Sequence, residues 1–157
     1  ERYKLEDLRM KPHTFLLIAA ATLPLLAGCE KARLDQQVKE LCAKDGGVKV
    51  YETVKLSPEK YDQFGKVKIP SKNDAKPSDD YYYESETKYY KTGNPDLRRV
   101  HDKIMRRGDG KVMGEFIYYA RRGGDLPGPW HPSSFGCPDL SSLPSFENSI
   151  FVKGDGK

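Results

Sequence analysis

The sequence contains little of what most catalytic and metal sites are built from. Its 157 residues include three histidines, three cysteines and one tryptophan. Neither CxxC nor HExxH spacing occurs, so we expect no metal site. GxGxxG and GxxxxGK[ST] sequences are also absent, so the sequence gives no support for a nucleotide-binding α/β fold or a bound cofactor. A chain of this length allows one ordinary domain and excludes a large multidomain enzyme.

The sequence also has no long stretch of one charge, because basic and acidic residues are interspersed. Lysine and arginine total 27 against 23 acidic residues, which gives a formal net charge of +4. The basic residues cluster only as local pairs such as Arg98-Arg99 and Arg106-Arg107. A nucleic-acid-binding domain usually carries a stronger basic stripe and a recognisable module. We therefore expect no nucleic-acid partner.

Long apolar runs are limited to one segment near the beginning of the sequence. It follows Lys11 and extends from Phe15 to Ala27, interrupted only by Thr22 and Pro24. About thirteen helical residues span only ~20 Å, whereas the hydrocarbon core of a bilayer is ~30 Å thick. The pattern therefore predicts a signal peptide that is removed, rather than a retained transmembrane helix.

This run ends in Leu26-Ala27-Gly28-Cys29, which resembles the lipobox of bacterial lipoprotein precursors. The resemblance implies that diacylglycerol is joined to the Cys29 sulfur, that the Gly28–Cys29 peptide bond is cut, and that the new amino group is acylated, for example with palmitate. Two or more fatty chains anchor a protein stably, whereas one chain binds only marginally. We expect a membrane tether at Cys29; the alternative is an apolar helix packed in the core.

The resemblance also divides the chain. Residues 1–9 begin without methionine and are rich in acidic residues, whereas a signal peptide normally begins cationic, so we interpret them as an upstream extension. Residues 10–28 are the expected lipoprotein signal peptide, and residues 29–157 a single periplasmic domain. In lipoprotein sorting, aspartate after the modified cysteine favours the inner membrane. Glu30 therefore favours the outer membrane of a Gram-negative host, with the domain facing the periplasm.

The cysteine count fits this interpretation. Lipid on Cys29 leaves Cys42 and Cys137, and export places both in an oxidising compartment where a disulfide persists. Closing a loop of nearly one hundred residues contributes ~4 to 5 kcal/mol from chain entropy. The alternative is two free, buried thiols.

A helix is expected over residues 30–45, ended by Gly46-Gly47. Its apolar residues share one stripe: Leu34, Val38, Leu41 and Cys42. Residues 48–56 then alternate as a half-buried strand, with these side chains on the apolar face: Val48, Val50, Val54 and Leu56. Glu52 falls on the same face. It is either a catalytic carboxylate with a raised pKa or, more commonly, a glutamate paired with arginine near a sheet edge.

Three further strands are expected at residues 81–91, 97–106 and 111–121. The intervening segment 92–95 contains glycine, asparagine and proline, and segment 107–110 contains two glycines, all residue types that suit tight turns. An antiparallel meander results. The predicted fold class is α+β, with an N-terminal helix packed on an antiparallel sheet of about four to five strands and a loop-rich C-terminal part.

Tyrosines concentrate in the expected strands, as Tyr81-Tyr82-Tyr83, Tyr89-Tyr90 and Tyr118-Tyr119. Alternation places neighbouring residues on opposite faces, so some fill the core and others present flat surfaces that could stack on sugars or dock a protein. Tyr82 and Tyr90 are therefore candidate binding residues. The alternative is that the tyrosines serve strand packing alone.

Residues 123–138 contain the only tryptophan and four prolines, which predict a stiff loop. Asp125, Trp130 and His131 are its candidate binding residues. A hydrolase could use His131 as base, Ser133 or Ser134 as nucleophile and Asp125 as orienter, but no GxSxG or SxxK signature supports it. The structural alternative is that this loop fastens a sheet edge.

The segments LCAKDGGVKVYE and GGDLPGPWHPSSFGCP resemble a group of small proteobacterial lipoproteins that are uncharacterised. The resemblance implies no activity. We expect a lipid-anchored, non-enzymatic module that binds or scaffolds an envelope protein or glycan. The alternatives are a periplasmic hydrolase and an inhibitor of a cell-wall enzyme.

Overall fold

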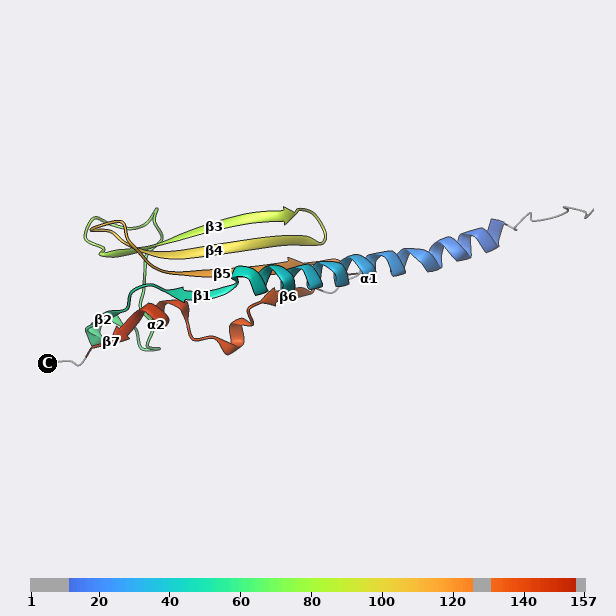
Figure 1. Ribbon diagram of the computed structural model, residues 1–157. Coiled ribbons are helices and arrows are strands. Elements are labelled where there is room, and N and C mark those ends of the chain that lie inside the picture. The colour runs from blue at the N-terminus through green and yellow to red at the C-terminus, as the bar shows by residue number, and fades with distance from the viewer. Residues whose placement is uncertain (1–11, 126–130, 155–157) are drawn as a thin grey trace, which may run out of the picture.

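The computed structural model describes residues 12–125 and 131–154, which form a long helix packed on an antiparallel sheet (Figure 1). The five-stranded sheet has the order β1-β5-β4-β3, with β6 also paired to β5, and β2 and β7 form a separate parallel pair. The helices and strands are α1 (Pro12–Asp45), β1 (Gly47–Val50), β2 (Val54–Leu56), β3 (Tyr81–Lys91), β4 (Asp96–Arg106), β5 (Val112–Arg122), β6 (Ser134–Cys137), α2 (Phe146–Ile150) and β7 (Phe151–Lys153), with 3-10 turns at Pro58–Lys60 and Leu140–Ser142. The predicted α+β class is confirmed.

Three eleven-residue strands, β3, β4 and β5, make the centre of the sheet. They follow one another as two antiparallel hairpins, as the sequence predicts, and their ends agree with the predicted ones to within one residue. Gly93 has a φ of 100° and Gly110 a φ of 67°. These left-handed conformations explain why both hairpin turns contain glycine.

The outer edge of β5 is shared by two short strands. β1 pairs with Gly114 to Ile117, and β6 pairs with Tyr119 to Arg122. The two short strands therefore lie end to end along one edge, although 83 residues separate Val50 from Ser134 by the chain numbering. This arrangement brings the chain after α1 and the chain after residue 130 to the same side of the sheet.

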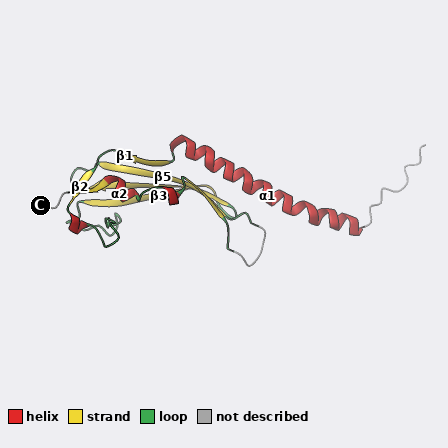
Figure 2. Cartoon of the chain, turned by 90° about the horizontal axis from the view of Figure 1, so that it is seen from below, coloured by secondary structure: helices red, strands yellow, loops and turns green. Residues whose placement is uncertain are grey.

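The helix α1 packs on one face of the sheet, called here the α1 face. Its residues Leu34, Val38 and Cys42 form a buried cluster with the strand residues Leu97, Ile117 and Tyr119. The predicted apolar stripe is thus confirmed, although α1 begins at Pro12 rather than at residue 30, and its first part projects beyond the sheet (Figures 1 and 2). Among the helices that the structure describes, none is both long and apolar enough to cross a membrane.

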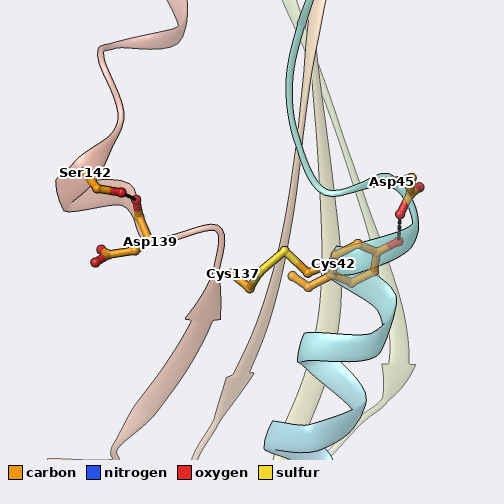
Figure 3. Close-up of a disulfide and its surroundings, with 6 residues drawn as sticks. Cys42, Asp45, Cys137, Asp139 and Ser142 are labelled. Atoms are coloured by element: carbon orange, nitrogen blue, oxygen red, sulfur yellow. Dashed lines mark hydrogen bonds between the residues drawn. A yellow bond between two sulfur atoms is a disulfide. The ribbon is translucent and has the colours of Figure 1, made fainter.

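A disulfide joins α1 to β6, as the sequence predicts. The sulfurs of Cys42 and Cys137 are bonded, and their Cα atoms lie 5.9 Å apart (Figure 3). The bond links residues 95 positions apart and closes the helix onto the sheet edge. Cys29 remains as an exposed free thiol.

A second core occupies the opposite face of the sheet. Its buried members are Val67, Ile104, Met113, Phe146, Ile150 and Phe151. Phe116 packs on this core, whereas its neighbour Ile117 packs under α1, as the alternation of a strand requires. The central strands therefore support one core near β6 and another near α2, on opposite faces.

The single strand predicted over residues 48–56 is wrong. Tyr51 and Glu52 both donate their backbone N–H groups to the carbonyl of Met113, which ends β1 and turns the chain away before β2 begins. Val48 and Val54 keep their places against the second core, but Val50 is 40% exposed. The break lets β2 pair with β7 instead of continuing along β5.

Candidate functional site

The α1 face continues past the end of the helix as an open, polar surface. The helix ends at Asp45, which accepts hydrogen bonds from Tyr119 (2.7 Å) and from Arg99 (3.3 Å). Further along the same face, strand alternation places the polar strip, which we define as Glu84, Glu86, His101, Lys103 and Glu115. Three adjacent strands thus contribute charged side chains to one surface.

His101 and Glu115 form the centre of the polar strip. The His101 Nε2 atom lies 2.7 Å from Glu115 Oε2, and the two side chains are only 13% and 15% exposed. They come from neighbouring strands, where Lys103 lies opposite Glu115 and His101 opposite Ile117. The pair is therefore a diagonal cross-strand contact, held in place by the register of β4 and β5.

The segment that leaves β1 covers the other side of Glu115. The Tyr51 hydroxyl donates a hydrogen bond of 2.6 Å to Glu115 Oε1, and Lys49 Nζ lies 3.3 Å from the same oxygen. The Tyr51 hydrogen bond, with those of His101 and Lys49, lowers the pKa of Glu115 to about 2. Glu115 is thus held as a carboxylate that orients three side chains.

A groove of about 430 Å³ lies beside this pair, between β3, β4 and the segment 71–73. That segment runs beside β3, because Ser71 forms a parallel bridge with Tyr83. Lys72 reaches over the groove to Glu84, with Nζ 2.7 Å from Oε1. Glu86, His101 and Lys103 also line the groove, so it offers groups of both charges at short range.

The lining of this groove determines which ligand chemistry it can accept. The Ser71 hydroxyl in the groove donates a hydrogen bond of 2.6 Å to the Asp74 carboxylate rather than to an imidazole. Within the part of the chain that the structure describes, no hydroxyl or thiol forms a hydrogen bond with His101, and no group of three or more His, Cys, Asp or Glu side chains is placed to hold a metal ion. A polar ligand with both charged and hydroxyl groups would match the groove lining.

Of the loop residues predicted as a site, Asp125 is engaged in holding the loop itself. Asp125 accepts hydrogen bonds from Lys31 (2.6 Å) and from the backbone N–H (2.6 Å) and hydroxyl (2.8 Å) of Ser133. The Lys31 contact, with those of Ser133, lowers the pKa of Asp125 well below its usual range. His131 is exposed, and among the described residues no hydrogen bond joins it to Ser133 or Asp125. Trp130 lies outside the described residues.

The two candidate tyrosines do not share one patch. Tyr82 lies near the beginning of β3, with the Arg107 guanidinium 5.4 Å from its ring centroid, and Tyr90 lies near the other end. Eight residues of strand separate them by roughly 26 Å. Tyr81 and Tyr83 pack against the second core, as the packing alternative expects. Tyr90 is 42% exposed and has its ring 6.2 Å from that of Tyr119.

Glu52 follows the commoner of its two interpretations. Arg106 donates to Glu52 at 2.6 Å and Lys111 donates to its other oxygen at 2.6 Å. The Lys111 hydrogen bond has the largest effect and the Arg106 hydrogen bond the next largest, and both lower the pKa of Glu52. The raised pKa that a catalytic role would require is therefore not present.

The sequence gives little indication of the polar strip. His101 is followed by Asp102, and alternation correctly indicates that these neighbours point to opposite faces: Asp102 is buried, while His101 lies in the strip. Its true partner, Glu115, is fourteen positions away. Predicting the His101–Glu115 contact from the sequence would have required the register of the β4–β5 hairpin.

Comparisons with known proteins add no assignment to this geometry. No family, no curated protein and no solved structure matches the chain.

Proposed function

We propose that this protein is a lipid-anchored envelope protein whose domain binds a partner without chemical turnover. The observation that carries the proposal is the position of Cys29. It is an exposed thiol at the end of the lipobox-like sequence, five residues before Leu34, which is the first buried residue of α1 among those described. Cleavage before Cys29 would remove nothing from either core described above.

The disulfide supports the same compartment. A bond between Cys42 and Cys137 persists in an oxidising environment such as the periplasm, and it leaves Cys29 as the unpaired cysteine. Glu30 at the next position favours the outer membrane under the lipoprotein sorting rules. The proposed protein is therefore held at the periplasmic surface of that membrane by acyl chains on Cys29.

The polar strip is the proposed binding surface. Its groove presents Lys72 and Lys103 together with Glu84 and Glu86, within reach of the partly buried His101–Glu115 pair. Paired charges of this kind provide orientation and specificity for a ligand that carries both charges. Among periplasmic partners, an envelope protein segment or a glycan with attached peptide has this chemistry.

Acyl labelling in the native host tests the anchor. We expect an alkyne-bearing palmitate to label the wild-type protein and a Cys42→Ser/Cys137→Ser control, but not a Cys29→Ser variant, which should accumulate as an uncleaved precursor. Intact mass should show the mature chain beginning at Cys29. Normal labelling of Cys29→Ser would overturn the proposal.

Site-specific photocrosslinking tests the binding surface. A photoreactive amino acid at Glu86, in the groove, should give a discrete crosslinked species in intact cells, whereas the same group at exposed Lys55 in β2 should not. Lys103→Glu should weaken the Glu86 crosslink, because it reverses one charge of the groove. Identical products from Glu86 and Lys55, or none from Glu86, would reject the polar strip as the binding surface.

A further inference from the structure

We propose that the end of the sheet beside Cys29 lies directly against lipid headgroups, so that the domain has one fixed orientation on the membrane. This inference rests on the proposed acylation of Cys29. The surface, called here the anchor end, is where β3 ends at Lys91, β4 begins at Asp96, β5 ends at Arg122 and β6 begins at Ser134. These four strand ends lie together by register. The anchor end lies on the side from which α1 projects in Figure 1.

The tether is too short to hold the domain away from the bilayer. Glu30 lies 3.5 Å from Lys91 Nζ, and Lys31 Nζ lies 2.6 Å from Asp125. Both contacts attach residues next to Cys29 to the anchor end. Leu34, 1% exposed, is reached after five residues, a helical rise of only ~7.5 Å. Acyl chains on Cys29 therefore place the headgroup level at the anchor end itself.

The side chains of the anchor end suit that level. Tyr89 is 50% exposed and Tyr90 is 42% exposed, next to each other near the end of β3. Tyrosine is favoured at membrane interfaces, because its ring is apolar and its hydroxyl remains hydrated. Lys88 is exposed beside them, with Nζ 5.5 Å from the Tyr90 ring centroid, and Arg122 is exposed on β5.

The acidic groups nearest the tether do not oppose this contact. Glu30 is paired with Lys91 and Asp125 with Lys31, so these two carboxylates are offset by cations within the domain. Asp96, the remaining carboxylate at the strand ends, lies opposite Arg122 in the register of β4 and β5. Lys88 and Arg122 add positive charge that headgroup phosphates attract. The apolar bodies of the two tyrosines and the two cations favour a lipid surface over a hydrated gap.

Fluorescence quenching in vesicles tests the orientation. The acylated protein is purified from its native host as two single-tryptophan variants, Trp130→Phe/Tyr89→Trp and Trp130→Phe/Phe64→Trp. Phe64 is 76% exposed and lies in the turn bridged by Tyr61 and Val67, beside the second core, so it provides the matched control. The vesicles contain phosphatidylethanolamine and phosphatidylglycerol with bromine near the headgroup end of the acyl chains.

We expect the fluorescence at position 89 to fall roughly twofold or more, as an interfacial aromatic residue would, and the fluorescence at position 64 to stay unchanged. Adding Lys88→Gln and Arg122→Gln should lower the equilibrium constant for contact between the anchor end and anionic vesicles roughly 25-fold, about fivefold for each charge removed. Quenching at position 89 should fall as a result. Unchanged quenching in that variant would overturn the assignment of the basic residues.

The remaining outcomes separate this inference from the anchor. Equal quenching at both positions, or none at position 89 in protein whose mass confirms acylation, overturns the orientation and leaves the anchor standing. Protein purified without lipid on Cys29 overturns both.

Discussion

Arg121 is the buried charge that joins α1 to the loop before β6, and its removal gives the sharpest test of the fold. The side chain is 2% exposed. Its Nε and Nη2 atoms donate to Asp35 on α1 at 2.7 and 3.2 Å. Its Nη1 atom donates to the carbonyls of Gly123 (2.7 Å) and Ser133 (3.0 Å) and to the Ser133 hydroxyl (3.0 Å). One guanidinium therefore satisfies groups from three segments.

The size of the effect follows from what remains after the change. Arg121→Met fills much of the same space but removes the donor of Asp35 and of the Gly123 carbonyl, whereas the Ser133 carbonyl still accepts the Gly123 N–H. Losing one partner of a buried ion pair typically costs about 3 to 5 kcal/mol. Asp35 keeps 26% side-chain exposure, so water relieves part of this penalty. We expect a loss of about 3 kcal/mol in the free energy of unfolding for Arg121→Met, the lower end of that range.

Urea denaturation of the mature chain carrying Cys29→Ser measures this loss. The matched control is Arg122→Met, because Arg122 is the next residue of β5 and is exposed, and such changes usually stay within about 0.5 kcal/mol. Asp35→Leu added to Arg121→Met should restore part of the stability, since the orphaned carboxylate is then gone. Equal losses for the two arginine variants would refute the role given to Arg121.

Three other changes have expected outcomes. Reducing the Cys42–Cys137 disulfide should lower the free energy of unfolding by about 4 kcal/mol, measured in urea with and without reductant. The pKa of Glu115 falls to about 2 in the fold from an ordinary value of 4.5, so the ionised carboxylate stabilises the folded state fully above pH 4.5. This stabilisation is lost as the pH falls toward 2. Glu115→Gln should therefore flatten the acid-unfolding profile over that pH range. Gly114→Ala should cost about 1 to 3 kcal/mol in thermal unfolding, because its methyl would lie 2.8 Å from Ile150 Cδ1 and from a backbone oxygen.

The elements that the sequence predicts well are those whose signals are local. β3, β4 and β5 alternate regularly and are bounded by turns that contain Gly93 and Gly110 in left-handed conformations. The apolar stripe of α1 likewise places Cys42 inward, where Cys137 meets it. In each case the spacing of a few residues decides both the element and its buried face.

The predictions fail where contacts between distant segments decide. Residues 48–56 alternate as one strand would, yet the carbonyl of Met113 accepts both the Tyr51 and Glu52 N–H groups and splits the segment. His101 finds its partner across a hairpin, through a register that residue types alone do not set. Arg121 is buried although arginine is seldom expected in a core, because α1 brings Asp35 to it.

α1 has a part that projects beyond the sheet and a part that packs on it, and the proposed cleavage before Cys29 falls between the two (Figure 1). The helix is continuous from Pro12 to Asp45, but its described core contacts begin at Leu34 and end at Cys42. Among the side chains that the structure describes, the first of α1 to form an ion pair with the sheet is Glu30, the second residue after the proposed cleavage point. The disulfide, Asp35 and Lys31 all attach the segment after Cys29, so the bonds that hold α1 to the sheet would survive removal of the preceding residues. An acyl anchor at Cys29 would then take the place of the projecting half of the helix without altering the core.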